Sequence, residues 1–211
     1  MDLYNDALPP YLEGLVPPRP PELLAMEDYA REHDFPIIGP SCGHFCYELA
    51  RMTKATRIFE LGSGYGYSTA FFAKAVRENG GGVVHHVVWD EDLSRRARVH
   101  LARLGMDDVV QYHVQEAIGA LRAHEGGLDI VFDDIEKQAY PASLPVIEEK
   151  LRPGGLLIVD NMLWRGRIFD PDNRTPQTEG IREMTRRLTQ SDRWISSLVP
   201  LRDGMIVALR R

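Results

Sequence analysis

Segments with strand character alternate with segments of helical character from residue 57 to residue 190. The strand segments are short and rich in β-branched residues, whereas the helical segments carry apolar residues at helical spacing. We expect strands at residues 57–61, 83–88, 109–113, 128–133 and 156–160, and helices at residues 66–78, 92–104, 116–124, 139–151 and 176–189. Because parallel strands need a long crossover, usually a helix, the alternation predicts an α/β fold with a doubly wound, mostly parallel sheet.

Two further strands are expected after this alternating region. Residues 194–199 and 205–209 flank Arg202-Asp-Gly204, which is a hairpin signal. The hairpin should add one antiparallel strand to the sheet.

The first 55 residues have a different character from the rest. Residues 1–20 contain five prolines and are expected to form an extended arm. A helix should follow at residues 21–33, and a second should begin at Ser41, as its N-cap, and end near Met52. No internal repeat or interdomain linker is visible. We therefore predict one domain over residues 1–211, with residues 1–55 as N-terminal arm and helices and residues 56–211 as a Rossmann-like core.

Composition excludes several classes of protein. The formal net charge of -6 argues against nucleic-acid binding, which usually needs a basic face. The chain has no apolar run near the ~20 residues that span a bilayer, and its acidic start lacks the apolar core of a signal peptide. Cys42 and Cys46, four residues apart in a predicted helix, suggest no disulfide framework, so a reducing, cytoplasmic location is expected.

A glycine-rich turn follows the first predicted strand, in Ile58-Phe-Glu-Leu-Gly-Ser-Gly-Tyr-Gly-Tyr-Ser68. Glycines let the chain turn sharply and let a ligand approach the backbone, and the next helix offers free N–H groups. Dinucleotide folds need a third glycine at the position that Tyr67 occupies here. Glu60 would repel a pyrophosphate but can accept from an ammonium group, which favours a cofactor bearing an amino acid. A purely structural turn without a ligand remains the alternative.

Two strand ends carry acidic residues, in Phe132-Asp-Asp-Ile-Glu-Lys137 and in Val159-Asp-Asn161. The carboxyl ends of parallel strands line the ligand crevice of a doubly wound sheet, so both motifs should face the glycine turn. Asp134, Asp160 and Asn161 offer the oxygen ligands that Mg²⁺ prefers. Acidic residues can also cap helices, which is the alternative for each motif taken singly.

Lysine and histidine complete the candidate chemistry. Lys137 is a possible general base beside the carboxylates. The seven histidines are scattered along the chain without zinc spacing, and each is interpreted as a surface or packing residue.

Taken together, these motifs resemble the cation-dependent O-methyltransferases, the group that includes catechol and caffeoyl-CoA O-methyltransferases and small bacterial relatives. The resemblance covers about residues 10–210. It is carried by the glycine turn, by the two acidic motifs with Tyr140 and Pro153-Gly-Gly155, and by Leu163-Trp-Arg-Gly166 and Val199-Pro-Leu-Arg-Asp-Gly204.

The resemblance implies a fold, a reaction and a set of roles. The fold would be that of class I S-adenosylmethionine-dependent methyltransferases, with seven strands, the last antiparallel, and N-terminal helices. The enzyme would transfer a methyl group from S-adenosylmethionine to a hydroxyl of a small, catechol-like or phenolic acceptor, helped by Mg²⁺ or a similar cation, and would often be a homodimer. Asp134, Asp160 and Asn161 would hold the cation, with Lys137 and Asp134 as catalytic residues. The cofactor would be held by Glu60, Gly62, Ser63, Gly64, Ser68, Trp89, Asp90, Glu116, Ala117 and Asp134.

Five positions depart from the family pattern. Val88 stands where the family usually has Glu, and Gln115 where it has Gly; both bear on how the nucleoside is held. Because Val88 cannot accept a hydrogen bond, we expect Asp90 to contact the ribose, with capping of the next helix as its alternative role. Asp133 replaces an apolar residue and Met184-Thr185 replaces Phe-Asn, and these bear on the acceptor.

Two rival functions remain open from the sequence. A non-catalytic module that binds S-adenosylmethionine would tolerate the departures at positions 88, 115 and 185. A nicotinamide-dependent oxidoreductase would use a similar turn, although Glu60 and the glycine spacing argue against it.

Overall fold

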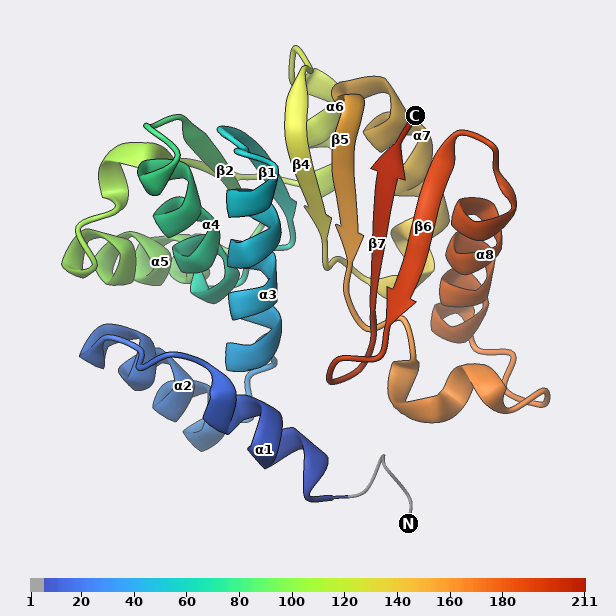
Figure 1. Ribbon diagram of the computed structural model, residues 1–211, viewed down its shortest axis with the longest axis horizontal. Coiled ribbons are helices and arrows are strands. Elements are labelled where there is room, and N and C mark those ends of the chain that lie inside the picture. Colours follow the sequence, from blue (N-terminus) through green and yellow to red (C-terminus); the bar gives the residue numbers. More distant parts are fainter. Residues whose placement is uncertain (1–5) are drawn as a thin grey trace.

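A seven-stranded sheet forms the centre of the computed structural model, which describes residues 6–211. The strands are β1 Arg57–Leu61, β2 Val83–Val88, β3 Val110–Val114, β4 Leu128–Asp133, β5 Leu151–Val159, β6 Trp194–Val199 and β7 Met205–Arg210. Their order is β3-β2-β1-β4-β5-β7-β6, with β1 to β5 parallel and β7 antiparallel to both β5 and β6 (Figure 1). The predicted doubly wound, mostly parallel sheet with an antiparallel last strand is confirmed.

Helices cover both faces of the sheet. They are α1 Leu8–Leu15, α2 Pro21–Glu32, α3 Gly39–Met52, α4 Tyr67–Glu78, α5 Glu91–Arg103, α6 Ala117–Ala123, α7 Tyr140–Lys150 and α8 Pro176–Gln190, with short 3₁₀ turns η1 Asp107–Val109, η2 Lys137–Ala139 and η3 Trp164–Phe169. Consecutive residues of β1 point to opposite faces of the sheet. Ile58 packs against α3 and α4, whereas Phe59 packs against α6 and α7. This alternation follows from the pleat of a strand buried on both faces.

The arm predicted for residues 1–20 is wrong in part. Leu8–Leu15 forms α1, with Pro9 and Pro10 inside it. Proline is tolerated there because the first N–H groups of a helix have no acceptor within the helix. Pro17, Pro18 and Pro20 do lie outside helices, and residues 1–5 lie outside the described part of the chain.

The predicted N-cap at Ser41 is also wrong. The helix begins at Gly39, and Ile38 precedes it without a side-chain cap. Pro40 takes a position in the first turn, where its missing N–H does no harm. Ser41 therefore lies within the first turn of α3.

Strand order reverses beside β1, which lies between β2 and β4. In open α/β sheets, ligands bind outside the carboxyl ends of the strands at this point. The arrowheads of β4 and β5 point toward the same end of the molecule as the β6–β7 loop, α1 and the segment between β5 and α8 (Figure 1). The topology therefore brings the glycine turn and both acidic motifs to one end of the sheet.

The remaining predictions from composition concern cysteines and membranes. Cys42 and Cys46 are both buried and carry free thiols. Across residues 6–211, none of the helices combines the length and the apolar character that crossing a bilayer requires.

Candidate active site

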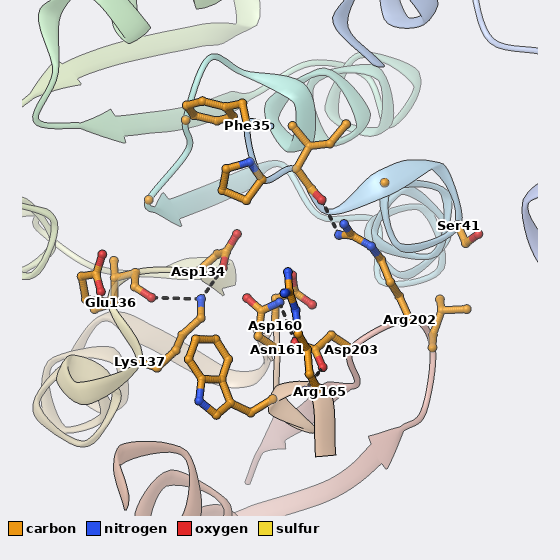
Figure 2. Close-up of a pocket in the computed structure, with 18 of the residues that line it drawn as sticks. Phe35, Ser41, Asp134, Glu136, Lys137, Asp160, Asn161, Arg165, Arg202 and Asp203 are labelled. Atoms are coloured by element: carbon orange, nitrogen blue, oxygen red, sulfur yellow. Dashed lines mark hydrogen bonds and ion pairs between the residues drawn. The ribbon is translucent and has the colours of Figure 1, made fainter. Parts of the chain in front are cut away.

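A cavity of about 1590 Å³ opens at the carboxyl ends of the strands. One end is bordered by the glycine turn and by the residues that follow β2 and β3. The other end is bordered by the residues that follow β4 and β5 and by the loop between β6 and β7 (Figure 2). The N-terminal segment contributes Leu8, Pro9 and Leu12 of α1 and Phe35 to Ile37 before α3.

Gly62 joins the glycine turn to the first acidic motif. Its φ is +87°, and a Cβ there would lie 2.6 Å from the carbonyl oxygen of Asp134. The backbone N–H of Asp134 donates to the Leu61 carbonyl at 2.9 Å. A side chain at position 62 would force these two turns apart, which gives a physical reason for glycine here.

Glu60 lies beneath the turn and not in the cavity wall. The side chain is fully buried, and Thr69 donates to its Oε2 at 2.5 Å. Oε1 has no hydrogen-bond partner in the described structure, and burial raises the pKa of Glu60 to about 7. Ser63 and Ser68 are also buried, and Ser63 Oγ accepts from the Val87 N–H at 2.9 Å. These three predicted cofactor residues therefore lie behind the cavity surface.

Asp90 takes the alternative role considered for it, as the N-cap of α5. Its Oδ1 accepts from the backbone N–H groups of Asp92 at 2.8 Å and Leu93 at 3.0 Å. Asp90 is exposed and does not line the cavity, whereas its neighbour Trp89 does and is 73% exposed. Contact between Asp90 and a ribose remains a prediction.

Glu116 likewise caps the helix that follows it. Its two carboxylate oxygens accept from the N–H groups of Ile118 and Gly119, at 2.8 and 2.6 Å. Glu116 and Ala117 both line the cavity. A cofactor contact by Glu116 would therefore come from a carboxylate that is already engaged.

The two acidic motifs meet in the cavity wall. Asp134 and Asp160, the acidic pair, both line it, together with Asn161 and Lys137 (Figure 2). Burial and the nearby charge of Asp134 raise the pKa of Asp160 to about 7, and burial also raises the pKa of Asp134. Each carboxylate therefore lies where a positive charge would stabilise its ionised form.

Lys137 supplies one such charge. Its Nζ donates to Asp134 Oδ1 at 2.7 Å and to the Ile135 carbonyl at 3.1 Å, and lies 5.1 Å from the centre of the Tyr140 ring. Only 8% of the Lys137 surface is exposed. The pairing fixes the amine at the edge of the cavity, next to the acidic pair.

The predicted cation ligands come together, but they are two carboxylates and one amide. Residues 6–211 contain no group of three or more His, Cys, Asp or Glu side chains arranged to hold a metal ion. Asn161 Nδ2 lies 3.4 Å from Asp203 Oδ2, so the amide nitrogen faces another carboxylate, which favours its oxygen as the ligand atom. This all-oxygen donor set fits a hard divalent cation.

The departures from the family pattern fall into two groups. Val88 and Gln115 line the cavity. Asp133 is fully buried and accepts from the Ser143 hydroxyl at 2.5 Å, with its pKa raised to about 7 by burial. Met184 of α8 is buried in the core between this helix and the sheet. Neither Asp133 nor Met184-Thr185 lines the cavity, so the expectation that they bear directly on the acceptor is not supported.

Several cavity residues were not assigned roles from the sequence. They are Trp164, Arg165 and Arg167 after β5, and Arg202 in the β6–β7 loop. Both segments belong to the motifs that carry the family resemblance, and both follow the end of a strand, which was the available signal. Arg165 and Arg202 extend into the cavity that the acidic pair borders (Figure 2).

Three histidines that are scattered along the sequence come together outside the cavity. His85 Nδ1 lies 3.1 Å from His113 Nε2, and His85 Nε2 lies 3.3 Å from His124 Nε2. The Gly126 N–H donates to His124 Nδ1 at 2.9 Å. That donor makes Nδ1 of His124 an acceptor, so each ring can donate to the next only when all three are neutral. We call this row of rings the imidazole chain.

Comparison with known proteins gives a consistent result. The sequence profile of the O-methyltransferase family matches residues 24–211. A catechol O-methyltransferase from Niastella koreensis is 29% identical over 210 residues, which cover 94% of each chain. The O-methyltransferase TomG from Streptomyces achromogenes, solved with SAM, superposes with a TM-score of 0.86 at 26% identity, over 97% of this chain and 96% of that one. A methyltransferase from Geobacter sulfurreducens has a TM-score of 0.84 at 27% identity, over 100% and 99% of the two chains.

Proposed function

The chain belongs to the O-methyltransferase family, and we propose that it transfers a methyl group from S-adenosylmethionine to a hydroxyl of a small vicinal diol, such as a catechol, with the help of a divalent cation. The observation that carries the proposal is the meeting of the glycine turn, the acidic pair and Lys137 around one cavity.

The glycine-turn end of the cavity suits the cofactor. Gly62 and Gly64 leave backbone accessible there, and exposed Trp89 offers a flat apolar surface for the adenine. The unpartnered Oε1 of Glu60 supports a cationic ligand group nearby, because an unsatisfied buried carboxylate oxygen destabilises the protein. Ser63, Ser68, Asp90, Glu116 and Ala117 remain the further proposed cofactor residues.

The acidic pair and Asn161 would hold the cation. Their oxygen donors and the raised pKa values of both carboxylates support this assignment. A divalent cation bound there would lower the pKa of a coordinated hydroxyl and stabilise its oxyanion. Two adjacent hydroxyls chelate better than one, which favours a vicinal diol.

Lys137 is proposed as the general base. The reaction breaks the sulfur–carbon bond of the donor and forms an oxygen–carbon bond. The hydroxyl proton passes to Nζ of Lys137, which must first release one proton to solvent so that the neutral amine can accept. The ammonium so formed stays beside Asp134 Oδ1, 2.7 Å away, which stabilises its charge. The buried position of Lys137 also keeps the amine in place, and such positioning supplies much of an enzyme's rate.

The proposal is tested with labelled S-adenosylmethionine and a panel of phenols, with and without added Mg²⁺. We expect turnover of vicinal diols only when the cation is present, and a raised melting temperature with the demethylated cofactor. A raised melting temperature without turnover of any hydroxyl acceptor would indicate the non-catalytic module. Stabilisation by NAD or NADP alone would indicate the oxidoreductase.

A further inference from the structure

The segment after β5 and the β6–β7 loop border the end of the cavity that lies opposite the glycine turn, which we call the acceptor end. Asp203 connects these two segments. Asp203 Oδ1 accepts from the backbone N–H of Arg165 at 2.6 Å, and the Asp203 carbonyl accepts from the Leu163 N–H at 2.8 Å. Gly204 allows this contact, because a Cβ there would lie 2.5 Å from the Leu163 side chain. The segment after β5 and the β6–β7 loop therefore form one frame.

The frame holds two arginines in an unusual backbone conformation. Arg165 and Arg202 have φ values of +51° and +53°, in the left-handed region that side chains rarely adopt. Backbone strain of this kind concentrates at functional sites. Both side chains extend into the cavity (Figure 2).

The charges of the cavity arginines are unpaired, unlike those of most arginines in this chain. All 21 arginines lie within the described residues, and 12 of them form ion pairs there with Asp or Glu: Arg19, Arg31, Arg51, Arg77, Arg95, Arg103, Arg152, Arg174, Arg182, Arg186, Arg187 and Arg193. Within residues 6–211, Arg165, Arg167 and Arg202 make no ion pair. Arg167 lies over the Trp164 ring at 5.3 Å, and Arg202 donates to the Ile37 carbonyl.

Neighbouring acids do not account for these charges. Asp134 is paired with Lys137, and Asp203 is engaged by the Arg165 backbone and by Asn161. Arg202 lowers the pKa values of Asp134 and Asp160 through space but lies outside ion-pair distance of both. The guanidinium of Arg165 has no partner of any kind in the described part of the chain. With a cation on the acidic pair, this end of the cavity is positively charged.

We infer that the acceptor is an anionic diol, whose carboxylate is held by Arg165 and Arg202 while the diol faces the acidic pair. The planar guanidinium matches a carboxylate with two parallel N–H groups, and such charged hydrogen bonds are among the strongest in proteins. This inference rests on the proposed function and adds the charge of the acceptor to it. Arg165 and Arg202 are then the residues that determine specificity.

The test compares 3,4-dihydroxybenzoate with 3,4-dihydroxybenzamide, which share the ring and the diol and differ in charge. We expect kcat/KM for the acid to exceed that for the amide by about 10- to 100-fold, as charged hydrogen bonds allow. Arg165→Gln should reduce this ratio about tenfold, mainly through KM, and Arg165→Lys should restore part of it. High salt should also reduce the ratio, because screening weakens the attraction.

Arg122→Gln is the matched control, since Arg122 is an exposed arginine of α6 outside the cavity, and its ratio should equal that of the wild type. Arg202→Gln is a second test, with its melting temperature measured because Arg202 also contacts Ile37. Equal kcat/KM for acid and amide in the wild type would overturn the inference and leave the proposed function intact. If neither the acid nor the amide is methylated, both the inference and the proposed function are overturned.

Discussion

The acidic pair at the ends of β4 and β5 and the imidazole chain beside β2 and β3 both hold ionisable side chains away from bulk water. Burial raises the pKa values of Asp134 and Asp160, and it lowers the pKa of His85 to about 4. In both clusters the protein favours the uncharged form of the side chain. The direction of a pKa shift alone therefore does not separate the two clusters.

The two clusters differ in their access to the cavity and in their hydrogen-bond partners. The acidic pair lines the cavity beside Lys137. The imidazole chain lies against Phe59, outside the cavity, and both ring nitrogens of His85 are used by other histidines. The three rings do not converge on one point where a metal could bind. A shifted pKa alone therefore does not identify a functional group, and we interpret the imidazole chain as a structural feature.

Removal of the cation should have the largest effect. Excess chelator, or Asp160→Ala, should lower methyl transfer by about 10³-fold or more, because several kcal/mol of charge stabilisation are lost. The fold should survive the substitution, since the Tyr140 hydroxyl bonds the backbone carbonyl of Asp160 and not its side chain. Turnover and melting temperature are measured together. Full activity in excess chelator would show that the acidic pair has no cation-binding role in methyl transfer. The acidic pair would then not differ in function from the imidazole chain.

Lys137→Ala should have the next largest effect. Turnover should fall by about 10²- to 10⁴-fold, the range for a lost general base, with little change in cofactor affinity. Lys150→Ala is the matched control, because Lys150 is equally buried but pairs with Glu149 and lies outside the cavity. Turnover that survives Lys137→Ala would assign the proton to another group.

His85→Phe should change stability and not activity. In the folded protein the pKa of His85 lies near 4, below the ordinary value near 6.5, so its contribution to stability is complete above pH 6.5 and is lost as the pH falls toward 4. The facing charges of Arg57 and Lys150 also disfavour protonation of the imidazole chain, whereas Glu125 favours protonation of His124. At pH 5 the loss from His85 should be about 2 kcal/mol.

Urea unfolding of wild type and His85→Phe at pH 7.5 and pH 5 measures this contribution. The variant should be the less stable protein at pH 7.5, and the difference should shrink or reverse at pH 5. An identical difference at both pH values would show that the imidazole chain is not held neutral. If the folded His85→Phe variant shows reduced methyl transfer at pH 7.5, the imidazole chain contributes to activity and is not only structural.

Asp90→Asn tests a residue that caps α5 and is also proposed to contact the ribose of the cofactor. If Asp90 contacts the ribose, the dissociation constant of the cofactor should rise by about fivefold, or about 1 kcal/mol, with a small change in the melting temperature. Calorimetric titration with the demethylated cofactor measures this. A lower melting temperature with unchanged affinity would leave Asp90 with its capping role alone.

The sheet and the acidic pair could be predicted because both depend on local pattern. Strand and helix periodicities are read within a few residues, and parallel strands necessarily bring Asp134 and Asp160 to the same edge. The imidazole chain could not be predicted, because it depends on the register that sets His85 diagonally from His113, and on where α6 ends.

The details around the site were less accessible to sequence reasoning. The roles of Pro9 and Pro10 depend on whether a helix begins just before them, which composition does not reveal. Arg165 and Arg202 lie 37 positions apart in the sequence and become neighbours only when Asp203 holds their loops together. Capping by Asp90 was weighed from its residue type and is observed.

The position of β7 has a consequence for how the chain folds during synthesis. β7 follows β6 in the sequence but lies between β5 and β6 in the sheet, so β6 has no strand to pair with until β7 has been made. Strands β1 to β5 each have at least one partner strand among themselves, so their pairing requires neither β6 nor β7. The acceptor end therefore forms last. A nascent chain that stops before β7 should be able to assemble the glycine-turn end of the cavity while it still lacks the wall that we propose selects the acceptor.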